Sequence, residues 1–275
     1  MNEMLLKDWT QFVEEVHKLE GEWIFRGVPN ESYELQPRIG RSTFPKWIAA
    51  FPNPKNFAEP LYSADAEFKM FEEFQRAALP YLDFSPRSDL EWLAVAQHCG
   101  LPTRLLDWTQ SPYVAAFFVV RDGPKYKEEL VYQGVDSLNE LRGLAEIAAS
   151  AKIGTRQKEV INCAVFAVRA PEEVKKDQLN DLFSKAPQRE ARLFYPPHLN
   201  RRVAAQLAVL TLHDSPELQW EPAELHKFRI DGGSSREFRE ALNLIGINES
   251  TMFADLDGLG RHLGWKHMNP KLFRR

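Results

Sequence analysis

The chain is poor in cysteine and has no long hydrophobic run, and both shortages restrict its class. Among 275 residues the only cysteines are Cys99 and Cys163, which lie in different apolar segments. They do not form a disulfide framework, and neither stands at metal-ligand spacing from another Cys or His, so we expect no metal and a reduced, cytoplasmic setting. Residues 1–19 are amphipathic and carry acidic side chains, which fits neither a signal peptide nor a membrane span.

Blocks of like charge are also absent. The 35 Lys and Arg residues nearly balance 39 Asp and Glu residues, which leaves a net charge of −4 and argues against a general nucleic-acid clamp. Local basic clusters at residues 201–202, at Arg229 and at residues 271–275 keep nucleic acid as an alternative partner. With 44% hydrophobic residues, the chain has enough apolar side chains to bury a full core.

Hydrophobic patterning predicts helices and strands in an irregular order. We expect helices over residues 1–20, 234–246 and 247–263, and helices that begin after Ser63, Ser88 and Ser111. The predicted strands cover residues 23–25, 163–168, 203–212 and 226–230. Because the strands do not alternate regularly with helices, the pattern favours an α+β fold with a mixed or antiparallel central sheet flanked by helices. We predict a single domain, residues 1–275, with a helical insertion at about residues 122–160.

The densest group of polar side chains lies between two apolar helices. The first helix is expected to end at Gly100, with His98 in its last turn, and the second to begin at Ser111. The residues between them would form a buried turn that holds polar side chains in a set geometry, which is typical of a binding or catalytic site. These side chains are Thr103, Arg104, Asp107, Trp108 and Thr109.

Three separated segments resemble the FRG-domain family, which is named for a Phe-Arg-Gly motif. That motif is Phe25-Arg26-Gly27 here, and residues 33–38 follow the family's Tyr-x-Leu-x-Pro-Arg pattern. Residues 97–109 match Gln-His-x-Gly-Leu-Pro-Thr-Arg-Leu-Leu-Asp-Trp-Thr. Residues 200–212 are similar to Arg-x-x-x-Gln-x-Gly-x-Phe, although Ala208 stands where the family has glycine. The resemblance spans about residues 23–263 and implies a single FRG-like domain.

The order of these segments is also similar to the site pattern of ADP-ribosyltransferases of the Arg-Ser-Glu type. That resemblance implies an ADP-ribosyltransferase-like architecture and an enzyme that uses NAD, either a transferase or an NAD glycohydrolase. Such an activity would suit a toxin or phage-defence effector that transfers ADP-ribose to an unidentified macromolecular acceptor. The implied catalytic residues are Arg26, Thr103 and Gln206. Gln206 takes the late-strand place where such enzymes normally have a carboxylate.

The same resemblance implies a set of residues that bind the nucleotide. Cleavage of the nicotinamide–ribose bond develops positive charge on the sugar, so the site must hold the diphosphate, stack on the nicotinamide and bond the ribose hydroxyls. Tyr33 or Trp108 would supply the stacking face, and an arginine fork suits the diphosphate. The implied binding residues are Arg26, Gly27, Tyr33, His98, Arg104, Asp107, Trp108 and Thr109.

Structural roles stay open for several of these side chains. Arg104 and Asp107 form either a catalytic pair or a salt bridge that locks the turn. His98 is a general base or a satisfied imidazole at a helix C-terminus. Arg26 is an anion ligand or a structural bridge to Asp107 or to a helix terminus. Gln206 is a site residue or a buried structural amide. The alternative functions are a non-catalytic module that binds a phosphate-bearing ligand, and a nucleic-acid-processing protein.

Overall fold

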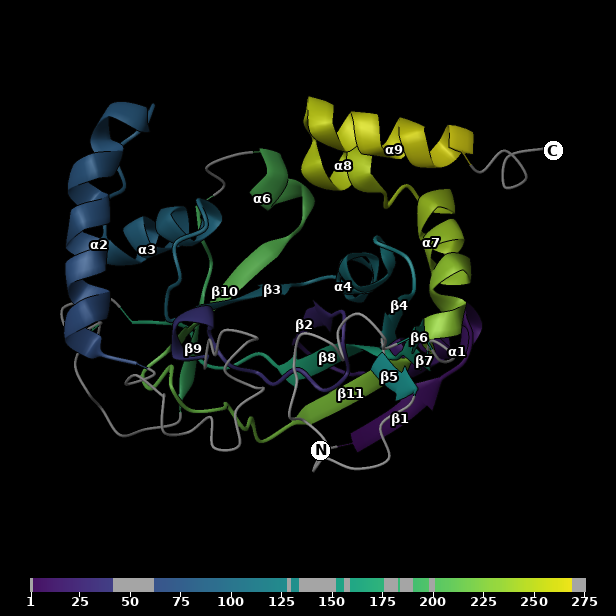
Figure 1. The fold of residues 1–275 in the computed structure, drawn as a ribbon. Helices are drawn as coiled ribbons and strands as arrows, with labels where there is room; N and C mark the ends of the chain where they lie inside the picture. The colour runs from purple at the N-terminus through teal and green to yellow at the C-terminus, as the bar shows by residue number, and fades with distance from the viewer. Residues whose placement is uncertain are drawn as a thin grey trace, which may run out of the picture.

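The computed structural model builds the chain around a seven-stranded sheet. It describes residues 2–41, 62–127, 130–133, 152–155, 159–175, 183, 190–197 and 201–268. The strand order is β1-β11-β8-β2-β3-β10-β9, and helices cover the sheet from above in Figure 1. The strands are β1 (Asn2–Leu6), β2 (Trp23–Val28), β3 (Leu105–Thr109), β8 (Cys163–Arg169), β9 (Ala191–Phe194), β10 (Ala208–His213) and β11 (Leu225–Ile230).

Strand pairing makes this sheet a mixed one. Strand β1 runs parallel to β11, whereas every other neighbouring pair in the sheet is antiparallel. Strand β8 lies between β11 and β2, and residues 163–168 are buried on both faces. That double burial explains the continuous apolar run in the sequence. The prediction of a mixed central sheet flanked by helices is therefore confirmed.

In the middle of the chain, the helices begin and end where local sequence signals predict. Ser63, Ser88 and Ser111 each accept a hydrogen bond from the amide three residues later, and Gly100 has a φ of 94° after its helix. The α-helices are α1 (Trp9–His17), α2 (Ala64–Ala78), α3 (Asp89–His98), α4 (Pro112–Val120), α6 (Arg201–Ala205), α7 (Ser235–Leu244), α8 (Glu249–Phe253) and α9 (Leu256–Met268). Short 3-10 turns occupy η1 (Arg38–Gly40), η4 (Leu79–Tyr81) and η7 (Gly232–Ser234).

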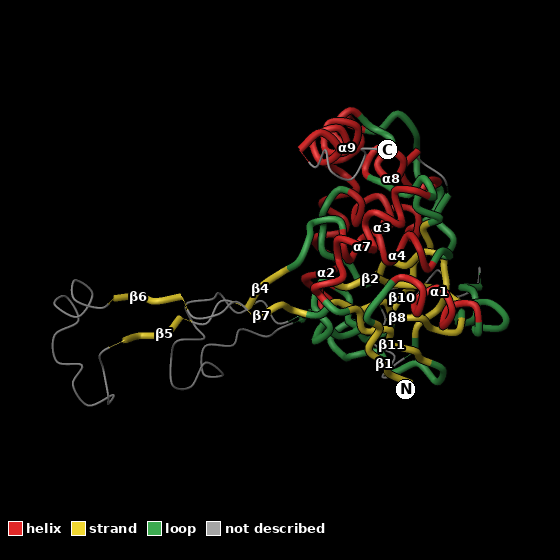
Figure 2. Tube along the Cα trace, turned by 90° about the vertical axis from the view of Figure 1, so that its right-hand side faces the viewer, coloured by secondary structure: helices red, strands yellow, loops and turns green. Residues whose placement is uncertain are grey.

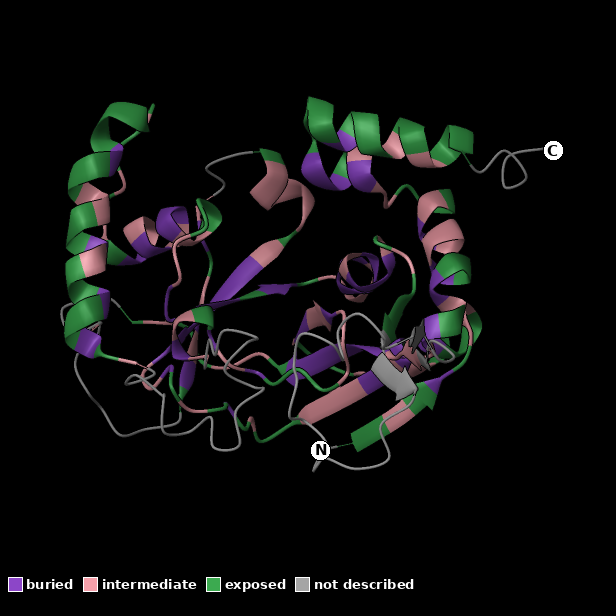
Figure 3. Ribbon diagram, viewed as in Figure 1, coloured by how far each residue is buried: buried purple, intermediate pink, exposed green. Residues whose placement is uncertain are grey.

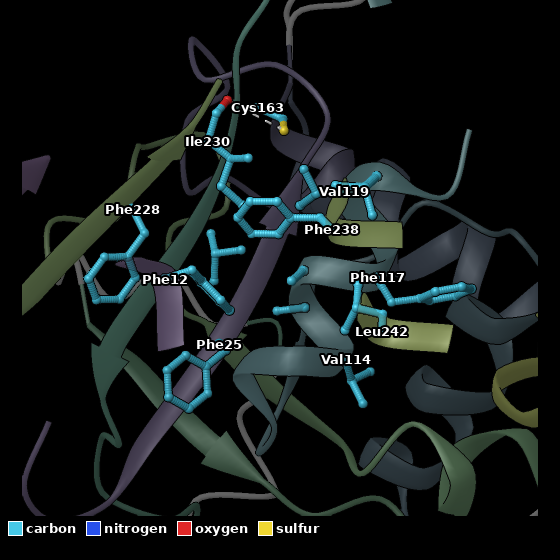
Figure 4. Packing of buried hydrophobic residues seen from close by; sticks show 14 of the residues in the cluster. Phe12, Phe25, Val114, Phe117, Val119, Cys163, Phe228, Ile230, Phe238 and Leu242 are labelled. Atoms are coloured by element: carbon cyan, nitrogen blue, oxygen red, sulfur yellow. Dashed lines mark hydrogen bonds between the residues drawn. The ribbon is translucent and has the colours of Figure 1, made fainter. Parts of the chain in front are cut away.

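Hydrophobic side chains gather on both faces of the sheet. Helix α4 is packed between β2, β8 and α7, and Figure 3 shows that it is buried almost all round while α2 and α9 expose their outer sides. Aromatic rings dominate the cluster around α4 (Figure 4): Phe12, Phe25, Phe117, Phe228 and Phe238. A second cluster on the opposite face contains Trp108 and Trp220, and a third lies beneath α2 and α3.

Gly27 allows α4 to approach the sheet. A Cβ at this position would overlap the backbone carbonyl oxygen of Ala115 in α4 and press on the side chain of Val119. Any larger residue would therefore push the helix away from β2. The glycine of the Phe-Arg-Gly motif is thus explained by helix–sheet packing.

The N-terminal segment differs from its prediction. The expected helix over residues 1–20 is divided into β1 and α1, with Asp8 as the N-cap whose side chain accepts from the amide of Gln11. The first segment is extended because it pairs with β11, more than 200 residues later, and buries Leu6. The amphipathic pattern carries no information about that distant pairing partner.

Two further elements near the C-terminus also differ. The strand expected over residues 203–212 is instead α6 followed by β10, separated by Leu207 with a φ of 46°, so Gln206 lies before the strand and not within it. The single helix expected over residues 247–263 is α8 followed by α9. Ala254, with a φ of 50°, separates them. Single left-handed residues other than glycine are uncommon, and local patterning does not predict them.

The expected helical insertion at residues 122–160 contains strands where it is described. These are β4 (Lys125–Lys127) with β7 (Glu159–Ile161), and β5 (Leu130–Gln133) with β6 (Lys152–Thr155), both pairs antiparallel. Figure 2 shows β4 and β7 leaving the main body together. The helix expected around residues 138–149 lies outside the described residues. In the parts of the chain that are described, none of the helices has the length and apolar character of a membrane span.

Candidate functional site

A cavity of about 690 Å³ lies over the middle of the sheet. Its floor comes from β2, β3 and β10, its sides from the ends of α3 and α4, and its upper rim from α6. Figure 1 shows α3 and α4 on the same side of the sheet with α6 above the space between them. This volume is within the range of about 300–1,000 Å³ that small-molecule sites occupy. The cavity is therefore large enough for a nucleotide.

Arg26 links β2 to β3 at the floor of the cavity. The two strands pair only at Phe25 and Thr109, and beyond this pair the Arg26 guanidinium bridges them. Its Nη1 donates to the backbone oxygen of Asp107 at 2.6 Å and lies 3.9 Å from that residue's Oδ2. The side chain is only 16% exposed, and burial lowers the pKa of Arg26 to about 10, so it stays cationic at neutral pH.

The carboxylate of Asp107 is presented to the cavity by its neighbours. Its side chain is 69% exposed, and Oδ1 accepts a hydrogen bond of 2.5 Å from Nε2 of Gln97. The amide oxygen of Gln97 in turn accepts from the hydroxyl of Thr103, which fixes the orientation of the amide. Thr103 is itself buried and does not line the cavity. It therefore acts on the site through Gln97.

Thr109 and Gln206 connect the central segment to the late segment. The Thr109 hydroxyl donates to the backbone oxygen of Gln206 at 2.7 Å, and both residues line the cavity. The side-chain amide of Gln206 donates to the backbone oxygen of Met252 at 3.0 Å, which ties it to α8. The structure thus brings Gln206 to the rim of the cavity, with one side of its amide engaged in a structural contact.

His98 and Cys99 line the cavity from the C-terminal end of α3. Burial lowers the pKa of His98, and the nearby positive charge of Arg202 lowers it further. The imidazole is consequently mostly neutral at pH 7. Cys99 is an exposed free thiol.

Part of the cavity wall comes from a segment that matches a known family model. Residues 21–128 match the family model of the FRG domain. This range supplies β2, α3, β3 and α4, whereas α6 and β10 close the cavity from outside the matched range. Comparison with curated proteins and with solved structures finds no match.

Arg104, in the FRG-matched range, has a structural partner that the sequence did not reveal. It pairs with Glu67 on α2 rather than with Asp107, with Nη2 2.6 Å from Oε2 and Nε 3.0 Å from Oε1. Both side chains are 1% exposed, and Nη2 also donates to the hydroxyl of Tyr62 at 2.8 Å. Arg104 does not line the cavity. This ion pair instead fastens α2 to the chain just before β3.

The two aromatic residues expected to stack on a ligand are placed elsewhere. The indole of Trp108 is buried in the cluster on the opposite face of the sheet, where Nε1 donates to Thr211 at 2.9 Å. The alternation of side chains along β3 causes this, because residues 105, 107 and 109 take the face toward the cavity. Tyr33 is half-exposed and lies away from the cavity lining. The aromatic residues that line the cavity are Phe25, Phe84, Trp108 and Phe118, although the indole of Trp108 packs in the cluster on the opposite face.

Several residues of the cavity were absent from the predicted set. Gln97, Arg121 and Arg202 all line it, and Gln97 and Arg202 lie in the segments that resemble the FRG family. Arg121 follows an apolar helix, and no sequence signal marked it. Within the described ranges no group of three or more His, Cys, Asp or Glu residues has a geometry suited to a metal ion.

Proposed function

We propose that the cavity binds a phosphate-bearing nucleotide, with NAD as the specific candidate. The observation that carries this proposal is the convergence of three distant segments, represented by Arg26, Asp107 and Gln206, on one cavity. Arg202 and Arg121 add positive charge at the rim, and Phe118 provides an apolar wall for a ring. A mostly apolar cavity with a few convergent polar groups is typical of small-molecule sites.

A second candidate, cleavage of the nicotinamide–ribose bond, is favoured by the carboxylate of Asp107. In that reaction the C1′–N bond breaks and its electron pair leaves with nicotinamide. An acceptor oxygen then bonds to C1′ and releases its proton to solvent. With water as the acceptor, the products are ADP-ribose, nicotinamide and a proton. An exposed carboxylate held by Gln97 can bond a ribose hydroxyl and stabilise the positive charge on the sugar.

The proposed roles differ from residue to residue. Asp107 would contact the ribose, whereas Arg26 and Thr103 would act as positioning residues through the contacts described above. Gln206 and His98 would contact the ligand at the rim. Transfer to a macromolecular acceptor, and a role as a toxin or phage-defence effector, stay predictions that depend on this chemistry.

Basic residues outside the cavity give nucleic acid little support. Arg229 is paired with Glu31, with Nε also 3.3 Å from Glu3, and is therefore not free to contact phosphates. The cluster at residues 271–275 lies outside the described residues.

Labelled NAD provides the test. We expect the protein to bind NAD in calorimetry, and we expect the Asp107→Asn variant to bind it while losing at least tenfold in nicotinamide release measured by chromatography. Asp65→Asn, at an exposed position on α2, is the matched control and should behave as the wild type.

Two results would decide against these proposals. Absence of binding to NAD, ADP-ribose and ATP would overturn the nucleotide site. Binding of NAD without nicotinamide release or labelled transfer would leave the nucleotide site standing and overturn the cleavage reaction.

A further inference from the structure

Three arginines from three different elements surround one phenylalanine ring beside the cavity. The guanidinium carbons of Arg121, Arg202 and Arg261 lie 4.9, 4.5 and 4.8 Å from the centre of the Phe253 ring. Arg121 follows α4, Arg202 belongs to α6 and Arg261 to α9. We call these three side chains the arginine cluster. Its members are 59 to 140 positions apart in the chain, so only the fold brings them together.

Among the described residues, only one member of the arginine cluster forms an ion pair with a carboxylate. Arg121 pairs with the neighbouring Asp122, with Nε 3.3 Å from Oδ1. In the part of the chain that the structure describes, no ion pair or hydrogen bond holds the side chain of Arg202 or of Arg261. Like charges held this close repel one another, and an anion between them would relieve that repulsion.

Two other arginines of the fold, Arg239 and Arg104, differ from the arginine cluster in their ion-pair partners. Arg239 also lies over an aromatic ring, that of Trp265 at 4.5 Å, but its Nη2 is 2.6 Å from a carboxylate oxygen of Glu249. Arg104 is paired with Glu67 in the same way. Arg239 and Arg104 thus each have a carboxylate partner, whereas none of the carboxylates among the described residues forms an ion pair with Arg202 or Arg261. Because Arg202 and Arg261 have no ion-pair partner in the described part of the chain, the geometry points to a ligand that supplies the negative charge.

Electrostatics agree with this geometry. Burial lowers the pKa of Arg202, and the charges of Arg121 and Arg261 lower it further. The carboxylates of Asp255 and Asp107 act in the opposite direction without forming an ion pair with Arg202. Arg202 therefore has an unfavourable environment for its charge in the free protein, and a bound anion would improve it.

We propose that the arginine cluster binds the phosphate groups of the ligand that occupies the cavity. Arg121 and Arg202 line the cavity as well as contacting Phe253, so the cluster is continuous with its rim. Guanidinium groups bind phosphate oxygens through pairs of parallel hydrogen bonds, and the Phe253 face holds their carbon side. The identity of the ligand as a nucleotide rests on the proposed function above, but the recognition of phosphate rests on the cluster alone.

In this proposal Arg26 has a structural role, and the arginine cluster binds phosphate. Arg26 is engaged with the backbone of Asp107 and is mostly buried, so it holds the floor of the cavity in place. The arginine cluster lies at the rim, where a diphosphate can be reached from solvent. A nucleotide would then place its sugar near Asp107 and its phosphates beside Arg202.

Inorganic pyrophosphate is the probe that tests the cluster. In calorimetry at low salt we expect pyrophosphate to bind the wild-type protein, and we expect Arg202→Gln to weaken binding at least tenfold and Arg261→Ala at least threefold. Arg202→Lys keeps the charge but loses the paired hydrogen bonds, so its affinity for pyrophosphate should fall between those of the wild type and Arg202→Gln. The control is Arg236→Ala, which removes an exposed arginine paired with Glu240 on α7 and should leave binding unchanged.

The outcomes separate this inference from the proposed function. Failure of pyrophosphate to bind, or equal binding by the wild type, Arg202→Gln and Arg261→Ala, would overturn the phosphate site. Each variant is compared with the wild type in thermal unfolding, and Arg261→Ala, at an exposed position, guards against a folding defect in Arg202→Gln. If pyrophosphate binding depends on the cluster but NAD does not bind, the cluster stands and the NAD proposal fails. If NAD binds and the cluster variants do not weaken NAD binding, the NAD proposal stands and the role of the arginine cluster in binding the ligand's phosphates fails.

Discussion

The backbone oxygen of Asp107 in β3 accepts a hydrogen bond from the guanidinium of Arg26 and not from the backbone of β2. Its Nη1 donates to the Asp107 carbonyl at 2.6 Å, on the side of β3 where β2 no longer pairs. Beyond the Phe25–Thr109 pair, a side chain therefore joins β2 to β3 at the cavity floor in place of the usual ladder of hydrogen bonds. This contact ties the arginine of the Phe-Arg-Gly motif to the carboxylate that faces the cavity.

Removal of this contact should disturb Asp107 more than it disturbs phosphate recognition. We expect Arg26→Lys to lower NAD cleavage at least tenfold, because one ammonium cannot reproduce the geometry of the guanidinium, and to cost about 1–3 kcal/mol of stability. Pyrophosphate affinity should stay within twofold of the wild type. The control is Arg87→Lys at an exposed position. A large loss of pyrophosphate affinity would instead make Arg26 a phosphate ligand.

Gly27 should tolerate no side chain. We expect Gly27→Ala to lower the free energy of unfolding by about 1–3 kcal/mol, because the new methyl group meets the Ala115 backbone and α4 must move. Gly260→Ala on α9 is the matched control, since a methyl group there has open space and alanine is the better helix former. Urea denaturation of the two variants measures the difference. Equal stability would show that α4 can shift freely away from β2.

The buried pair of Arg104 and Glu67 should be important for stability and not for ligand binding. Glu67→Gln leaves a buried guanidinium without its counter-ion, and such losses cost about 3–5 kcal/mol. Replacing both residues by apolar ones, in a Glu67→Leu and Arg104→Met double variant, should recover part of that loss. Glu72→Gln, exposed on the same helix, is the control for denaturation. A double variant no more stable than Glu67→Gln would argue against the ion pair as the cause.

His213 should make the protein sensitive to acid. Burial, with a smaller contribution from the charge of Arg26, lowers the pKa of its imidazole from 6.5 to about 3. The unfolded chain therefore takes up a proton below pH 6.5 that the folded chain does not, so stability falls as the pH falls from 6.5 toward 3.

A variant that cannot titrate isolates this effect. Between pH 7 and pH 5, His213→Gln should lose about 2 kcal/mol less stability than the wild type, at about 1.4 kcal/mol for each pH unit below the ordinary pKa. Urea unfolding at several pH values measures both slopes. Parallel slopes in the two proteins would mean that the imidazole is already protonated in the fold, or reaches water.

Local sequence signals predicted the elements around the cavity well. Ser88, Gly100 and Ser111 mark the helix ends on either side of β3, and the apolar run at residues 163–168 is the central strand. These features depend on neighbours within a few positions in the chain, where hydrogen-bond caps and side-chain alternation act. The segment between the helices was predicted as a turn but contains β3, because its extended shape depends on pairing with β10.

The errors in the predicted site also arose because local patterns do not encode contacts with distant parts of the chain. Arg104 was expected to face Asp107, three residues away, but its partner is Glu67, 37 residues earlier. Trp108 was expected to face a ligand, but its strand directs it to the opposite face. The side of a strand on which a residue lies is periodic and can be read locally, yet which side faces the cavity depends on where the helices pack.

By itself, the sequence determined the caps, the central apolar strand and the three segments that resemble the FRG family. It also placed Arg26, Asp107 and Gln206 in those segments. Only the tertiary structure decided that these residues share a cavity, that Arg104 and Trp108 are turned away from it, and that an arginine cluster forms around Phe253. The physical reason is distance along the chain, because contacts between residues a hundred positions apart depend on strand pairing and helix packing that no local pattern encodes.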